Sequence, residues 1–136
     1  YNNYLNKELV PVHSLKSVIA QIINCNKGES VGYNRSFLCK NDMKVGVIPI
    51  GHADGISRFF SKNAYVSISG KKAEVLGNIC MDVLMINLNG INCDEGDEVV
   101  VFDSINNAED YAKSVGTISY EILTNLSSRI ERKIIR

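Results

Sequence analysis

Closely spaced turn residues divide this chain into short β-type segments, and this division limits the folds that it can adopt. Residues 43–50 form a nearly continuous apolar run, which is typical of a strand buried on both faces. Residues 65–69 instead alternate with period two before a turn at 70–71, as a half-buried strand does. Further strands are expected over residues 15–24, 81–87 and 98–102. Short strands at this spacing predict a small, closed or nearly closed β-barrel.

Helical signals are confined to the last third of the chain. Asn106 or Asn107 can cap a short helix over residues 108–114, whose first turn carries two acidic side chains. A second short helix is expected to follow, with Thr117 or Ser119 as its cap. The predicted fold class is therefore mainly β, a small β-barrel-like domain with one or two short helices near the C-terminus.

The end of the chain alternates basic and apolar residues, and we expect it to return to strand. The basic residues then form a solvated face of that last strand rather than a binding patch. They are Arg129, Arg132, Lys133 and Arg136, which alternate with Ile130, Ile134 and Ile135.

Composition indicates one ordinary globular domain of 136 residues, with 45% apolar and 22% charged residues. The 15 basic and 15 acidic residues balance, which argues against nucleic acid or a membrane surface as a partner. Neither a membrane span nor a signal peptide is recognisable, so we expect a cytoplasmic protein. Four scattered cysteines and two histidines lack metal-ligand spacing, so we expect reduced thiols and no metal site.

Four short phrases carry the most specific signal. They are Ser-Val-Gly-Tyr over residues 30–33, Val-Ile-Pro-Ile-Gly-His-Ala-Asp-Gly over residues 47–55, Gly-Asn-Ile-Cys-Met-Asp over residues 77–82 and Gly-Thr-Ile-Ser-Tyr-Glu over residues 116–121. In this order they closely resemble the C-terminal β-domain of alanine racemases, which depend on pyridoxal 5'-phosphate (PLP). The resemblance covers nearly the whole chain, yet no segment resembles the one that carries the cofactor lysine.

The resemblance implies that residues 1–136 form the C-terminal β-domain of an enzyme that interconverts L- and D-alanine for peptidoglycan synthesis. It implies an upstream (β/α)-barrel domain, absent from this chain, that binds PLP covalently through a Schiff-base lysine. It also implies a head-to-tail homodimer. This chain alone lacks that lysine and should be inactive. Two alternatives stay open: a racemase of another small amino acid such as serine, and a non-catalytic β-barrel dimerisation module.

Tyr33 is the candidate catalytic residue. It stands between Gly32 and Asn34, and asparagine tolerates a positive φ better than most residues, so the turn can project the side chain away from the sheet. A phenol is a poor base at neutral pH unless cations or hydrogen bonds stabilise the phenolate, and in isolation a packed loop aromatic is the commoner role. The resemblance implies that Tyr33 moves the α-proton of the substrate on the face opposite the cofactor lysine. Alanine racemases usually carry glycine where Asn34 stands.

Tyr120 is the candidate cofactor-binding residue. Taken alone, it is more typical of an ordinary helical core tyrosine, although at the start of a helix its hydroxyl could donate to an anion. The resemblance implies a hydrogen bond from Tyr120 to the cofactor phosphate in its own subunit, whereas Tyr33 and Met81 complete the partner's site.

Three further residues are candidates for substrate binding. Cys80 suggests a thiol nucleophile, but a cysteine in an apolar strand without a paired histidine is usually inert. The resemblance assigns the role to Met81 instead, whose backbone N–H helps to bind the substrate carboxylate, and it places Asp82 near the entrance. His52 replaces the usual tyrosine at the mouth of the site, and a histidine is smaller and can become cationic near neutral pH. Asp54 is expected to fix the turn around His52 by side-chain-to-backbone hydrogen bonding.

Overall fold

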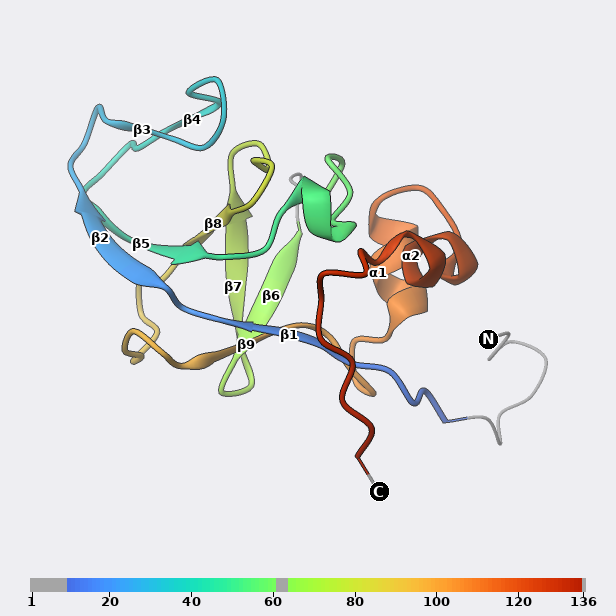
Figure 1. Ribbon diagram of the computed structural model, residues 1–136. Helices are drawn as coiled ribbons and strands as arrows, with labels where there is room; N and C mark the ends of the chain where they lie inside the picture. The colour runs from blue at the N-terminus through green and yellow to red at the C-terminus, as the bar shows by residue number, and fades with distance from the viewer. Residues whose placement is uncertain (1–9, 61–63, 136) are drawn as a thin grey trace.

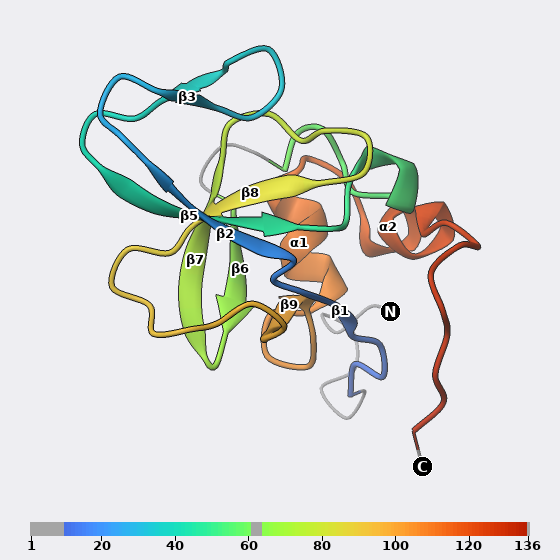
Figure 2. The same cartoon turned by 60° about the vertical axis from the view of Figure 1, so that its left-hand side comes forward.

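The computed structural model describes residues 10–60 and 64–135, which build a curled seven-stranded antiparallel sheet and two short helices (Figure 1). In spatial order the sheet contains β1 (Leu15–Val18), β9 (Glu98–Phe102), β6 (Tyr65–Ile68), β7 (Lys71–Leu76), β8 (Leu84–Asn87), β5 (Met43–Ile48) and β2 (Gln21–Cys25). A separate ribbon pairs β3 (Ser30–Val31) with β4 (Phe37–Leu38). The helices are α1 (Ala108–Ser114), α2 (Ser119–Asn125) and the single 3₁₀ turn η1 (His52–Asp54). The ribbon lies at the upper left of Figure 2, and α2 lies at the right of the same view.

One bent segment supplies both edge strands of the sheet. The expected strand over residues 15–24 is in fact two strands, because β1 pairs with β9 and β2 pairs with β5. At the bend, Ile19 N–H donates to Asp97 O at 3.0 Å and Ala20 N–H donates to Val47 O at 2.9 Å. The two edges are thus consecutive along the chain, and the prediction of a mainly β, barrel-like fold is confirmed.

The apolar patterns correctly predicted which strands are covered on which faces. In β5, Ile48 belongs to the main core, whereas Val45 packs in a smaller cluster with Val31 of β3 and Leu76 of β7. The β3–β4 ribbon therefore helps to cover the second face of β5. A strand that is apolar along its whole length is expected to be covered on both faces. In β6, Val66 is fully buried and Tyr65 is half-buried, as the alternation predicted.

Both helices were predicted, but only one has the expected cap. Asn107 caps α1, since its Oδ1 accepts from Glu109 N–H at 2.9 Å and from Asp110 N–H at 3.2 Å. The N-cap position of α2 is Ile118, which makes no side-chain cap hydrogen bond. Neither Thr117 nor Ser119 is the cap: the Thr117 hydroxyl instead contacts the Glu121 carboxylate.

Two strand predictions were wrong in extent. Strand β8 begins at Leu84 rather than at residue 81, because Cys80 N–H donates to Val83 O at 3.0 Å and closes a turn. The expected last strand does not form within residues 127–135. There the Arg132 guanidinium donates hydrogen bonds to the backbone carbonyls of Leu126, Ser127 and Ile130. Arg136 lies outside the described residues. No helix in the described part of the chain is long and apolar enough to cross a bilayer.

Candidate functional site

Three loops meet around an open pocket of about 230 Å³. They are the β3–β4 turn, the His52 turn (residues 49–55, after β5) and the Met81 loop (residues 77–83, between β7 and β8). The residues that line the pocket are Tyr33, His52, Arg58, Ile79, Cys80 and Met81. The fold thus brings together three residues that the sequence singled out separately: Tyr33, His52 and Met81.

A left-handed turn presents Tyr33 to the pocket. Asn34 and Arg35 have φ values of 58° and 51°, so Asn34 adopts the positive φ that asparagine tolerates better than most residues. Tyr33 forms a bridge with Asn78 of the Met81 loop, in which Tyr33 N–H donates to Asn78 O at 3.4 Å. The residue is 61% exposed, and its hydroxyl makes no hydrogen bond to any residue in the described ranges. The phenol is therefore free to meet a ligand.

The Met81 loop is joined to the His52 turn by backbone hydrogen bonds. His52 N–H donates to Cys80 O at 3.0 Å, and Ala53 N–H donates to Met81 O at 2.8 Å. The approach requires Gly51, because a Cβ there would lie 2.5 Å from Met81 O and 2.6 Å from Cys80 O. Both carbonyls are occupied, whereas Met81 N–H donates no hydrogen bond within the described residues. It remains available as a donor to a bound carboxylate.

His52 is exposed but held in one orientation. Its Nδ1 lies 3.1 Å from Ile56 O, and because a carbonyl can only accept, Nδ1 carries the hydrogen of this bond. His52 also borders a larger open cleft of about 620 Å³ that extends to α2. His52 therefore lines both the pocket and the cleft.

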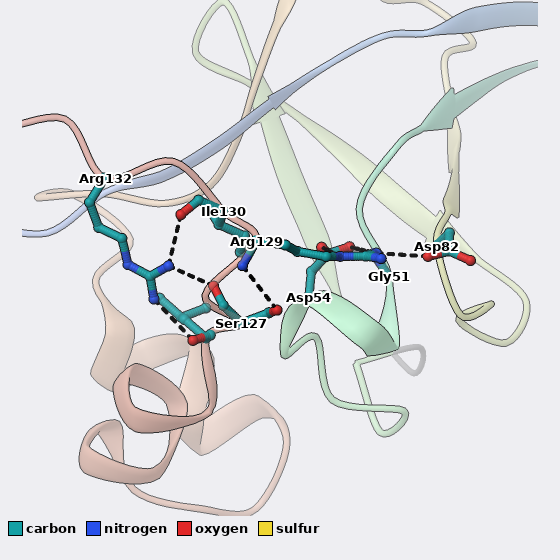
Figure 3. A network of polar contacts seen from close by, with 8 residues as sticks. Gly51, Asp54, Asp82, Ser127, Arg129, Ile130 and Arg132 are labelled. Carbon is teal, nitrogen blue, oxygen red and sulfur yellow. Dashed lines mark hydrogen bonds and ion pairs between the residues drawn. The ribbon is translucent and has the colours of Figure 1, made fainter.

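Asp54 and Asp82 converge on one arginine of the C-terminal segment (Figure 3). Arg129 Nε lies 2.6 Å from Asp54 Oδ1, and its Nη2 lies 3.0 Å from Asp54 Oδ2 and 2.7 Å from Asp82 Oδ1. Gly51 N–H also donates to Asp54 Oδ2 at 2.8 Å, so Asp54 fixes the turn as expected. Arg129 was predicted to be a solvated residue of a last strand, and this was wrong.

The network perturbs the ionisation of its buried member. The hydrogen bonds from Arg129 lower the pKa of Asp54, and the Gly51 N–H adds to this effect, although burial of the carboxylate opposes it. The two carboxylates in turn raise the pKa of Arg129. Asp82 is exposed and paired with Arg129, and it does not line the pocket. Local sequence gives no signal for this network, because Arg129 lies 75 and 47 residues from its two partners.

Tyr120 lies apart from the pocket, in the first turn of α2. The residue is 70% exposed, and its hydroxyl has no hydrogen-bond partner among residues 10–60 and 64–135. The fold therefore does not place Tyr120 with Tyr33. All four cysteines are free thiols, and no three potential metal-binding side chains gather anywhere in the described ranges.

Comparisons with known proteins identify relatives of this domain. A family profile described as "Alanine racemase, C-terminal domain" matches residues 12–134. An alanine racemase of Helicobacter pylori (strain G27) is 39% identical over 128 residues, which are 91% of this chain and 34% of that protein.

Solved structures agree in fold. The chain superposes on alanine racemase from Clostridium difficile 630, in complex with cycloserine, with a TM-score of 0.84 and 38% identity, over 90% of this chain and 33% of that one. It superposes on alanine racemase from Bartonella henselae with covalently bound pyridoxal phosphate with a TM-score of 0.85 and 29% identity, over 90% and 34%. The chain spans about a third of the length of these relatives.

Proposed function

The chain belongs to the alanine racemase C-terminal domain family, and we therefore propose that it forms the C-terminal part of an isomerase that interconverts L- and D-alanine. The D-alanine serves peptidoglycan synthesis. Because the chain spans about a third of its relatives, we assign the remainder of the active site to an N-terminal barrel domain of the same gene product and to a homodimer. The observation that carries the proposal is the pocket that gathers Tyr33, His52 and Met81.

Tyr33 is the proton-transferring group that this chain contributes. Racemisation takes the α-proton from one face of the substrate and returns a proton to the other, which requires two acid/base groups. The Tyr33 hydroxyl is exposed and unpaired within the described residues, so it can reach a substrate held at the pocket. Arg58 lines the same pocket and adds a positive charge that favours the substrate carboxylate.

Met81 and His52 orient the substrate. The unpaired Met81 N–H donates to the substrate carboxylate, and the Nδ1–Ile56 bond holds the His52 ring at the mouth of the pocket. Asp82 lies just outside, where its charge influences entry.

The residues of this chain fit one end of pyridoxal phosphate. Tyr120 offers an exposed hydroxyl without a partner among the described residues, and such a donor is what a phosphate oxygen requires. The cofactor itself would be held by a lysine of the upstream domain, and when bound it would supply the electron sink that makes the α-proton removable.

The test is a racemisation assay on the full-length parent protein, purified with its cofactor. We expect L-alanine to be converted to a mixture of both enantiomers, with a higher kcat/KM than for L-serine, whereas the isolated 136-residue chain should show no turnover. Preference for serine would change the assigned substrate. An inactive parent protein with bound cofactor, or measurable turnover by the isolated chain, would contradict the proposal.

A further inference from the structure

We infer that Arg129 is a positioning residue for the substrate carboxylate, because its guanidinium fixes the Met81 loop to the His52 turn from outside the pocket. This role rests on the proposed function and adds to it a residue that does not line the pocket. Arg129 contacts one carboxylate on each of the two structures that it joins (Figure 3).

Arginine suits this task by its shape. The planar guanidinium presents Nε and Nη2 to the two oxygens of Asp54, at 2.6 and 3.0 Å, while Nη2 also reaches Asp82 at 2.7 Å. A lysine ammonium is a single point of charge on a flexible stem and cannot reproduce the fork. The geometry therefore depends on the side chain being arginine and not merely on its being positive.

The two carboxylates differ in burial, so they depend on Arg129 to different degrees. The Asp54 side chain is 8% exposed, and a nearly buried carboxylate requires a partner, so the Asp54 pair fixes the guanidinium in place. The Asp82 side chain is 68% exposed and needs no such partner for its own solvation. Asp54 is thus the anchor, and Asp82 is the residue whose position the anchored guanidinium determines.

Asp82 follows Met81 directly in the chain. On the N-terminal side of the loop, Cys80 O and Met81 O accept hydrogen bonds from the His52 turn. The Arg129–Asp82 contact holds the C-terminal side. With both sides held, the free Met81 N–H has one position relative to Tyr33. Without Arg129 the loop would keep its hydrogen bonds to the His52 turn and to the β3–β4 turn, but no described residue would hold the Asp82 side chain.

Arg132 is a matched control in the same segment. Its guanidinium donates to the carbonyls of Ser127, Ile130 and Leu126 and contacts neither loop (Figure 3). Replacing it perturbs the C-terminal segment without touching the Asp54–Asp82 connection.

The experiment uses the full-length holoenzyme and its Arg129→Lys, Asp82→Asn and Arg132→Gln variants. We expect Arg129→Lys to raise the KM for alanine about tenfold while kcat changes much less, since ground-state carboxylate binding is what weakens. Propionate, a carboxylate without the reacting amino group, should bind about tenfold more weakly by calorimetry, in proportion to KM. Asp82→Asn, which leaves the buried pair intact, should give the same shift, and Arg132→Gln should give neither.

A double variant separates positioning from general damage. If Arg129 acts through Asp82, the combination of Arg129→Lys with Asp82→Asn should raise KM no further than the larger single effect. Wild-type KM and propionate affinity in Arg129→Lys, or equal shifts in Arg132→Gln, would overturn the inference alone. A wild-type parent protein that does not racemise alanine would overturn the proposed function, and the inference with it.

Discussion

Asp54 is the residue on which the geometry around the pocket depends. Its carboxylate is almost buried, yet all of its contacts are with donors: Gly51 N–H on its own turn and the guanidinium of Arg129. Its backbone carbonyl also accepts from Ser127 N–H at 3.1 Å, which ties the C-terminal segment to the same turn. One side chain thereby determines the shape of the His52 turn and the place of the residue that binds Asp82.

Asp54 should make the stability of the chain depend on pH. Its pKa is lowered in the folded state, so the unfolded chain takes up the proton first as the pH falls. The stabilisation is therefore complete above about pH 5 and is lost as the pH falls through the folded-state pKa, below the unfolded value of about 3.9. Asp54→Asn should cost about 2 kcal/mol at pH 7, where a charged hydrogen-bond acceptor is removed.

Urea unfolding of the 136-residue chain between pH 7 and pH 2.5 would measure this effect. The difference in unfolding free energy between wild type and Asp54→Asn should narrow steadily below about pH 4. A difference that stays constant over the whole range would show that the charge of Asp54 is not what stabilises the turn.

The two helices differ in how their first turns are satisfied, and this has a measurable consequence. Asn107→Ala should destabilise the chain by about 1 kcal/mol, because Glu109 N–H and Asp110 N–H lose their shared acceptor. Ile118→Ala, at the equivalent position of α2, removes no cap hydrogen bond and should change the unfolding free energy by less than about 0.5 kcal/mol. Equal losses in both variants would refute the assigned caps.

Sequence reasoning succeeded where the signal is local and failed where the partner is distant. Alternation in β6 and the apolar run of β5 follow from which faces are covered, and the Asn107 cap follows from a side chain beside its own acceptor groups. Residues 127–135 looked like a strand because their polarity alternates, but strand formation requires a neighbouring edge. Within the described residues the segment pairs with neither edge of the sheet, and the Arg132 guanidinium instead donates to the backbone carbonyls of Leu126, Ser127 and Ile130.

The candidate site shows the same division. Tyr33, His52 and Met81 were found because each lies in a specific phrase, and the fold brings the three to one pocket. Arg129 could not be assigned from its surroundings, because its charge serves two carboxylates on loops far away in the chain. Roles carried by single long-range contacts require the three-dimensional structure.

At the scale of the whole molecule, the described residues form a curled sheet whose loops meet around an open pocket. One bent segment brings the sheet round on itself, and the loops that leave β3, β5 and β7 converge on the pocket. Tyr33 and Tyr120 are both exposed, unpaired within the described residues and separate from each other. The proposed function requires such exposed hydroxyls, because in it this chain completes an active site that other parts of the enzyme build.

We propose that Tyr33 moves the substrate proton, and the turnover of the full-length Tyr33→Phe variant measures this role. The phenol hydroxyl is the only group removed, so cofactor content should stay at the wild-type level while kcat/KM for alanine falls about 10²-fold or more in both directions. Tyr65→Phe is the control, since that hydroxyl donates to Asn106 Oδ1 outside the pocket and should be dispensable for turnover. Near-normal racemisation by Tyr33→Phe would contradict the claim.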